Sequence, residues 1–236
     1  SSLGGMLGPF LAGMIITIAT GYTGYRIIFG ISLGLFAVAV ILSFVIHRRP
    51  AKGKFDFIRI WKERRNNPDW GRILDAHLMQ GIREGTFLFI VSIFVFLSTG
   101  SEMSLGMFGL LNSGIGMLTY FAAAKFIKKE HRNKAILLGG IGLFLSIFLL
   151  IFELSYMKLL MYGVLIAIFY PMLLVPYVSL TYDVIGRSWN AAEKRVEYIV
   201  LRDLYVNIGR ICSILIFLAS ITFFHTEDVL PYLLIV

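Results

Sequence analysis

Charged side chains are scarce in this sequence of 236 residues: Asp, Glu, Lys and Arg make up 15% of it, against about 25% in an ordinary soluble domain. A soluble domain needs polar side chains to cover its surface, and a disordered chain needs low hydrophobicity. Neither class fits a hydrophobic fraction of 58% and a mean hydropathy of +0.80. What remains is a membrane protein with several spans.

Motifs of redox, metal and enzyme chemistry are also missing. The one cysteine, Cys212, excludes a disulfide within the chain and leaves no Cys pair for a metal or redox motif. There is no phosphate-binding glycine loop, no Gly-x-Ser-x-Gly and no His-Glu-x-x-His, and the four histidines are scattered. We therefore expect that the protein is not an enzyme and holds no cofactor and no metal.

Long apolar runs dominate what is present. A helix crosses a bilayer core about 30 Å thick with about 20 apolar residues, and open strands cannot span hydrocarbon. We therefore predict an all-α integral membrane protein, a polytopic helical bundle with about 7–8 transmembrane helices. The predicted spans are Leu3–Thr20, Ile27–Ile46, Ile73–Leu97, Leu105–Ile127, Ala135–Phe152, Leu159–Leu180 and Tyr198–Phe224, and a further one opens at Val229.

Positive charge is concentrated in alternate connecting segments. His47–Arg72 carries nine Lys and Arg residues, Lys125–Lys134 five and Thr181–Arg195 three, while each intervening turn carries at most one. The positive-inside rule places the rich segments in the cytoplasm. The net charge of +8 is then a signal of topology and of attraction to anionic lipid, and we expect no nucleic-acid partner. The predicted location is a bacterial cytoplasmic membrane, crossed several times.

The longest basic segment contains a short amphipathic stretch. Phe55, Phe57, Ile58, Ile60 and Trp61 alternate with basic residues, which predicts a helix lying in the headgroup plane with its apolar side chains inserted. A new helix is expected to begin near Trp70, because Asn67-Pro68-Asp69 combines an N-cap, a first-turn proline and a first-turn acid. We expect three parts: 1–46, a linker at 47–72, and 73–236.

Both ends of the sequence indicate a fragment of a longer protein. Ser1 stands where an initiator Met would be and leads directly into an apolar helix. The last apolar run, from Val229 to Val236, stops abruptly. We expect the missing part to include further helices of the same bundle.

The first span combines small residues with a proline. Gly4, Gly8 and Ala12 share one helix face, which predicts close approach of another helix there, with Gly13 one residue further. Pro9 lacks an N–H and so leaves the carbonyl of Gly5 without its helical donor. An ordinary packing stripe is the simpler interpretation of the small residues, and a moving, bent helix is the functional one.

This stretch resembles the antiporter signature in the fifth transmembrane helix of the major facilitator superfamily. That signature reads Gly-x-x-x-Gly-Pro-x-x-Gly-Gly; Gly4, Gly8, Pro9 and Gly13 match it, and Ala12 replaces the penultimate glycine. A basic loop at 124–134 stands where the superfamily carries one between helices eight and nine, without its leading Gly and Asp-Arg pair. The layout, two helices, a basic linker and a run of helices, is similar to helices five to twelve.

The resemblance implies a transporter that moves a small solute by alternating access, a monomer built of two six-helix halves. The sequence would begin at helix five and end inside helix twelve, and the amino-terminal helices would be missing. Exchange of the solute for protons, as in multidrug or metabolite efflux, is implied by the glycine-proline motif alone. Half of any substrate site would lie in the missing helices.

Polar residues interrupt the third predicted span. His77, Gln80 and Glu84 share one helix face, with Arg83 beside them, and Arg83 and Glu84 lie about 15 Å along the span from Ile73. Charges at that depth are expensive, so they predict a substrate or proton pathway in a water-filled cavity. Glu84 is expected to carry the proton, His77 to relay it, and Arg83 to hold Glu84 or an anion. The alternative is that these charges only brace the bundle.

The last complete span is polar as well. Asp203, Asn207 and Arg210 share a face, and Arg210 is the deeper charge, a candidate for an anionic substrate or a gate pair. Asp203 and Arg210 are equally open to the interpretation of an internal brace. In the sixth span, Pro171 and Pro176 predict two kinks, either a moving gate or ordinary proline kinks.

Two other functions stay open at this point. The first is a membrane sensor, scaffold or assembly subunit that keeps the fold but moves no solute. The second is a lipid flippase with a lateral opening lined by basic residues. A water-accessible pocket lined by His77, Glu84 and Arg210 would favour transport, whereas mutually paired and buried charges would favour bracing.

Overall fold

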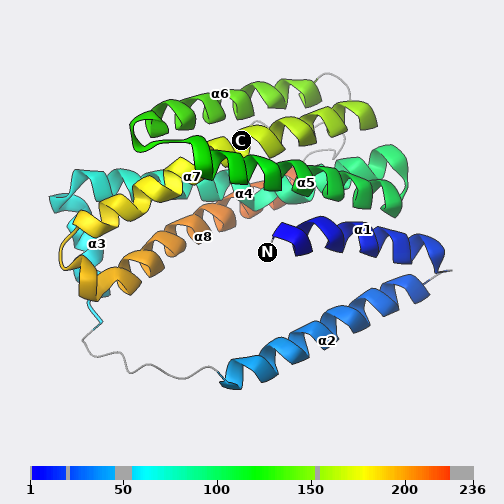
Figure 1. Cartoon of the computed structure of the whole chain (residues 1–236), viewed down its shortest axis with the longest axis horizontal. Helices are drawn as coiled ribbons and strands as arrows, with labels where there is room; N and C mark the ends of the chain where they lie inside the picture. The colour runs from blue at the N-terminus through cyan, green and yellow to red at the C-terminus, as the bar shows by residue number, and fades with distance from the viewer. Residues whose placement is uncertain (1, 20–21, 46–54, 152–154, 224–236) are drawn as a thin grey trace.

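The computed structural model describes residues 2–19, 22–45, 55–151 and 155–223, and within these ranges every regular element is a helix (Figure 1). The predicted start at Val229 lies outside the described residues. The prediction of an all-α protein is confirmed. In chain order the helices are α1 (Ser2–Ile18), α2 (Thr23–Val45), α3 (Phe57–Asn66), α4 (Pro68–Thr99), α5 (Glu102–Phe126), the 3₁₀ turn η1 (Lys129–His131), α6 (Arg132–Ile151), α7 (Tyr156–Arg187) and α8 (Ala191–Phe223).

Among the described residues, five helices are long and apolar enough to cross a membrane. They are α2, α4, α5, a segment of η1 and α6 at Lys129–Leu149, and α7; α1 contributes a shorter apolar stretch, Leu7–Ile18. α8, which we predicted as a span, has 33 residues and carries Arg202, Asp203 and Arg210. It is not among the five.

The start of α4 follows the local signal in the sequence. The side chain of Asn67 accepts a hydrogen bond from the backbone N–H of Trp70 at 3.2 Å, Pro68 occupies the first turn, and Asp69 is the first-turn acid. This arrangement satisfies one of the N–H groups that a helix start leaves without a partner. At the other end, Gly100 closes α4 with a φ of 60°, a left-handed conformation that glycine adopts without steric cost.

The linker helix α3 packs on the protein more than its sequence predicts. Ile60, expected to insert into headgroups, is completely buried in a cluster formed by Ile60, Trp70, Ile73, Leu74, Ile185, Tyr198 and Leu201. Trp61 and Arg64 also approach the hydroxyl of Tyr205 on α8, both at 3.3 Å. Phe55, Ile58 and Trp61 keep large exposed surfaces, and their insertion into headgroups stays a prediction.

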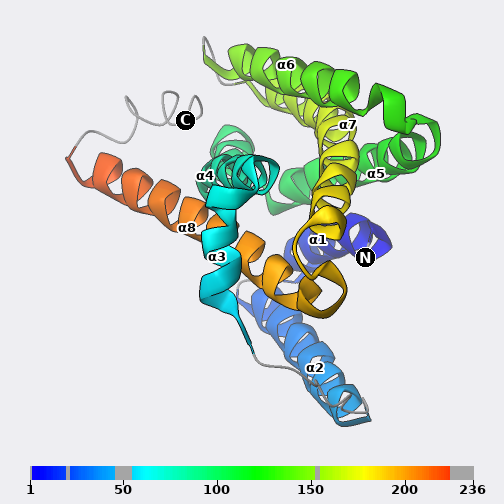
Figure 2. The ribbon, with the colours of Figure 1, turned by 90° about the vertical axis from the view of Figure 1, so that its left-hand side faces the viewer.

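Close helix pairs organise the rest of the bundle: α4 with α8, α6 with α7, and α1 with α5. Glycines mark the crossing of α4 and α8, since a Cβ at Gly81 would overlap the backbone of Val206 and one at Gly209 would overlap that of Leu78. The views in Figures 1 and 2 place α2 at the edge of the molecule, where it leads away from α1. Along α2, Gly24 is buried, Ile28 and Ser32 are half-buried, and the other residues are exposed.

The contact between α1 and α5 is made by residues of α1 other than Gly4 and Gly8. A Cβ at Gly4 or Gly8 would meet nothing within 4 Å in the described structure, so the close approach does not occur there. It occurs at Gly13, which lies against the carbonyl of Glu102, and at Pro9, which lies against Gly106. Ala12 is half-buried. Close approach of another helix at Gly4 and Gly8 stays a prediction, because a small-residue stripe indicates where a helix fits and not which helix it is.

Two apolar clusters bracket a polar middle along α4. The first, at the start of α4, is the cluster around Ile60 and Trp70. The second, towards its end, consists of Ile90, Val91, Phe94, Val95, Phe108, Leu159 and Tyr162. α7 contributes to both clusters in the reverse order along its sequence. The polar side chains of His77, Gln80, Arg83 and Glu84 therefore lie between two apolar clusters.

Candidate functional site

A cavity of about 550 Å³ lies between α1, α4, α5, α7 and α8. Its volume is within the usual range for small-molecule sites, roughly 300–1,000 Å³. The predicted site residues Arg83, Glu84, Arg210 and Pro171 line it, and His77 does not. The other lining residues are Gly5, Val91, Ser92, Phe108, Asn112, Ser113, Gly116, Met117, Tyr120, Ile166, Ala167 and Tyr170.

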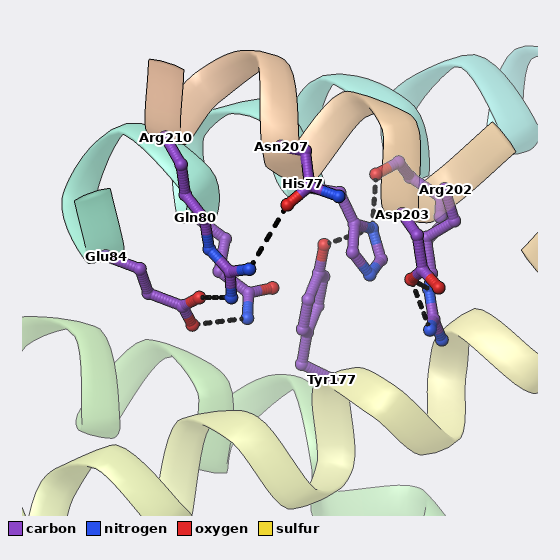
Figure 3. Close-up of polar contacts among 9 residues, drawn as sticks. His77, Gln80, Glu84, Tyr177, Arg202, Asp203, Asn207 and Arg210 are labelled. Carbon is purple, nitrogen blue, oxygen red and sulfur yellow. Dashed lines mark hydrogen bonds and ion pairs between the residues drawn. The ribbon is translucent and has the colours of Figure 1, made fainter. Parts of the chain in front are cut away.

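Glu84 is the point where three helices meet in this cavity. One carboxylate oxygen, Oε1, accepts hydrogen bonds from Gln80 Nε2 at 2.8 Å and from the hydroxyl of Tyr170 at 2.7 Å. The other, Oε2, accepts from Nη2 of Arg210 at 2.7 Å (Figure 3). The three donors belong to α4, α7 and α8, so the charge on Glu84 holds these helices together at the cavity.

The two arginines approach the cavity differently. Arg210 reaches Glu84 with one guanidinium nitrogen and donates from the other, Nη1, to the side-chain oxygen of Asn207 at 3.3 Å. Arg83 has its guanidinium carbon 5.0 Å from the centre of the Tyr170 ring, a cation–π geometry. Tyr170 therefore touches both Glu84, through its hydroxyl, and Arg83, through its ring.

His77 lies on the same face of α4 but outside the cavity, and only 3% of its surface is exposed. Its Nδ1 is 2.8 Å from the carbonyl oxygen of Ile73 and 2.6 Å from the hydroxyl oxygen of Tyr177 (Figure 3). A carbonyl only accepts, so the Ile73 contact is a hydrogen bond when Nδ1 carries the proton. The relay from His77 to Glu84 that we predicted has no direct hydrogen bond between the two residues in the described structure.

The remaining polar residues of α8 separate into two groups. Asp203, which is exposed, accepts from the half-buried Arg202 at 2.7 Å, and this pair lies away from Glu84 (Figure 3). Asn207 supports Arg210, as described above. Pro176 on α7 is buried but does not line the cavity, whereas Pro171, five residues earlier, does.

The carbonyl that Pro9 releases has found a partner on α5. The hydroxyl of Ser113 donates to the carbonyl oxygen of Gly5 at 2.9 Å, which is the group that the N–H of a residue at position 9 would have reached. Both Gly5 and Ser113 line the cavity. Pro9 thus leaves the carbonyl of Gly5 without its helical donor, and the side chain of Ser113 in the cavity wall donates to it instead.

Sequence reasoning missed several parts of this site. Ser113, Gly116 and Tyr120 on α5 and Tyr170 on α7 were not singled out. A Tyr-Pro pair inside an apolar helix was the one available signal for Tyr170. The residues of α5 carried no signal, because isolated Ser, Gly and Tyr are common in membrane helices. Within the part of the chain that the structure describes, no group of three or more His, Cys, Asp or Glu side chains is arranged for a metal.

The bundle of long apolar helices, with its basic linker, defines an integral membrane protein that crosses the bilayer several times. The family model described as Major Facilitator Superfamily matches residues 1–211, and the chain belongs to this superfamily. The resemblance drawn from Gly4, Gly8, Pro9 and Gly13 is thereby confirmed.

A particular relative is a protein of Bacillus subtilis (strain 168), described as "Uncharacterized protein YqgE". It is 51% identical over 231 residues, which cover 98% of this chain and 54% of the relative. The chain thus spans about half the length of the curated relative it matches. No solved structure matches the chain.

Proposed function

We propose that this protein is a secondary active transporter that moves a small organic solute by alternating access and couples the movement to protons at Glu84. The observation that carries the proposal is the position of this carboxylate, in a cavity of about 550 Å³ and bound by donors from α4, α7 and α8. Its membership of the superfamily supports the same conclusion. The proposed setting is the cytoplasmic membrane of a bacterium, and the proposed state is a monomer.

The division of the chain at 46 and 72 goes with this proposal. The first two helices would end the amino-terminal half of the transporter, and α4 to α8 would belong to the carboxy-terminal half. The contact of Pro9 and Gly13 with α5 would then be part of the interface between halves that must move in alternating access. The other helices of the amino-terminal half would complete the cavity.

The chemistry of the Glu84 cluster supports the proposed proton coupling. While Glu84 is ionised, it accepts all three hydrogen bonds and pairs with Arg210. A proton on the carboxyl removes the charge that holds Arg210, so Arg210 and the phenol of Tyr170 become able to bind other groups. A switch in the contacts of three helices is the kind of event that can bias a bundle between two arrangements.

Reconstituted full-length protein tests this function. Liposomes that enclose a pH-sensitive dye receive organic anions, cations and neutral solutes one at a time, and solute uptake and internal pH are recorded together. We expect wild-type protein to move protons with at least one solute and Glu84→Gln to lose the proton movement. Asp75→Asn is the matched control, because Asp75 is also an ion-paired acid on α4, bound to Arg64 at 2.8 Å, but lies outside the cavity.

The proposal fails if Glu84→Gln moves the solute and protons with the wild-type dependence on pH. The sign of the pH change also tests the exchange predicted by the glycine-proline motif, since exchange and co-transport move protons in opposite directions relative to the solute.

One observation favours a second function, a membrane sensor or scaffold that does not transport. The Glu84–Arg210 pair is already formed, at 2.7 Å, and a formed pair can serve as a brace. This function predicts that Glu84→Gln and Arg210→Gln lower thermal stability while no solute of the panel moves in any variant. The same liposome experiment distinguishes the two functions.

A further inference from the structure

The charges around the cavity are unequal. Its lining in the described residues includes two guanidinium groups, Arg83 and Arg210, and one carboxylate, Glu84. With all three ionised, the lining carries one excess positive charge. Such a surface favours a negatively charged group and repels a cation.

In the ion pair of Glu84 and Arg210, the positively charged side chain is the more accessible one. The side chain of Arg210 is 46% exposed, whereas that of Glu84 is 16% exposed beneath its three donors. A guanidinium has five N–H donors in a planar fork that fits a carboxylate or phosphate. Of the two partners in this ion pair, the guanidinium of Arg210 is therefore the more exposed.

The remaining wall suits an apolar body. Most of the lining is apolar and comes from α4, α5, α7 and α1, and the charged side chains in it are Arg83, Glu84 and Arg210. Apolar pockets with a few convergent polar groups bind ligands that are apolar with one polar anchor. The apolar lining residues are Val91, Phe108, Met117, Ile166, Ala167 and Pro171.

We infer that the cavity binds an amphiphilic organic anion, an apolar body with one acidic group, and that the anion binds together with a proton. The acidic group takes Arg210 away from Glu84, and the carboxylate then takes up a proton from the surrounding solution because its ion-pair partner is gone. The charged or titratable groups that line the cavity around Glu84 are Arg83 on α4, Tyr120 on α5, Tyr170 on α7 and Arg210 on α8; Gly5 on α1 carries none. This inference rests on the proposed function and names its substrate class.

The direction of coupling is the part that departs from the sequence prediction. If anion and proton occupy the cavity together, they cross the membrane in the same direction, whereas the glycine-proline motif predicts exchange. Thermodynamic linkage makes the inference measurable without transport: an anion that promotes protonation must bind more tightly as the pH falls.

Binding to the full-length protein in lipid nanodiscs tests the inference. The probes are naphthalene-1-acetate, its neutral amide and 1-naphthylmethylammonium, which share one ring system and differ in charge. Titration calorimetry, corrected with empty nanodiscs, gives affinity, and a pH dye in weak buffer gives protons taken up per ligand. We expect the acetate to bind at least tenfold more tightly than the amide, the ammonium to bind least, and the acetate to bring in close to one proton at pH 7.5.

Variants locate the effect. Arg210→Gln should abolish the preference for acetate over amide, and Arg210→Lys should restore part of it. Glu84→Gln should still bind the acetate, but without proton uptake and without pH dependence between pH 6 and 8. Arg202→Gln is the matched control, because Arg202 is on the same helix and paired with an acid, Asp203, but outside the cavity.

Two results overturn the inference: equal affinity for acetate and amide, or release of protons when the acetate binds. Failure of the proposed function looks different. If the acetate bound with proton uptake but no solute crossed the liposome membrane, the anion site would be supported and the transport function would be contradicted. If another solute crossed the membrane with protons and the acetate were not preferred, the transport function would be supported and the anion site would be contradicted.

Discussion

Two polar layers of the same helix pair differ sharply in this protein. In the first, which we call the His77 layer, His77 of α4 meets Tyr177 of α7. In the second, the Glu84 layer, Glu84 of α4 meets Tyr170 of α7. Each layer joins a polar side chain of α4 to a tyrosine hydroxyl of α7, and the two lie seven residues apart along both helices. The His77 layer is buried, and the Glu84 layer opens into the cavity.

The difference between the layers comes from their neighbours. The His77 layer adjoins the apolar cluster under α3, where Trp70, Leu74 and Tyr198 fill the space. At the Glu84 layer, Gly116 has open space in place of a side chain, and Arg210 arrives from α8. Two similarly polar positions in the sequence therefore have different surroundings. The contact of His77 is buried, and the charge of Glu84 is accessible from the cavity.

The largest effect on stability is expected at the crossing of α4 and α8. Gly81→Ala should lower stability by about 1–3 kcal/mol or more, because the new Cβ would overlap the backbone of Val206. Gly116→Ala is the control: a Cβ there meets nothing within 4 Å, and alanine favours a helix by about 0.5–1 kcal/mol. Thermal unfolding in detergent measures both variants. Equal melting temperatures would show that the crossing is not tightly packed.

The next largest effect is expected at His77, where we predict a loss of stability without a loss of transport. His77→Leu should destabilise the protein by about 1–3 kcal/mol, because the buried hydroxyl of Tyr177 loses its neighbour. Proton-coupled flux per folded molecule should stay near the wild-type value, since His77 does not line the cavity. Flux is measured in liposomes and normalised to folded protein. Loss of coupling with normal stability would restore His77 to the proton pathway that the sequence predicted.

A matched pair of tyrosine variants sharpens the comparison. Tyr170→Phe removes one of the three donors to Glu84, and a net loss of about 0.5–1.5 kcal/mol corresponds to roughly a two- to twelve-fold change in coupled flux. Tyr177→Phe removes the equivalent hydroxyl from the His77 layer and should leave the flux unchanged. If Tyr177→Phe impaired flux as much as Tyr170→Phe, the two layers would share one function.

The smallest effect is expected for an ion pair outside both layers. Arg64 and Asp75 are in contact at 2.8 Å, but their side chains are 42% and 53% exposed. Exposed pairs contribute about 0–1 kcal/mol, so Asp75→Asn should shift the melting temperature little. A loss as large as that of His77→Leu would mean that the contact of α3 with α4 stabilises the whole bundle.

Local chemistry was predictable from the sequence, and the pairing of helices was not. The start of α4 at Asn67 and Pro68 and the free carbonyl of Gly5 both depend on residues within one helical turn, and the structure confirms the first and supplies a partner for the second. The partners of Glu84 on α7 and α8 depend on how each helix is rotated. Apolar side chains suit lipid and protein neighbours equally well, so hydropathy contains little information on that rotation.

The same limit applies to the predicted site. Helical spacing placed His77 and Glu84 on one face, and the structure agrees, but spacing does not say where along that face a cavity opens. The stripe of small residues likewise did not indicate which of its members contact α5; in the structure these are Pro9 and Gly13.

The central claim is that water reaches the Glu84 layer and does not reach the His77 layer. The reactivity of single cysteines in the two layers tests this claim most directly. In full-length protein with Cys212→Ser, single cysteines are introduced as Asn112→Cys, in the cavity wall, and Thr181→Cys, one turn from Tyr177 and fully buried. A membrane-impermeant sulfonate thiol reagent is then applied to each variant in liposomes. We predict that the cysteine at 112 reacts, that naphthalene-1-acetate slows this reaction, and that the cysteine at 181 stays unmodified. Equal reaction at both positions, or none at 112, would contradict the account.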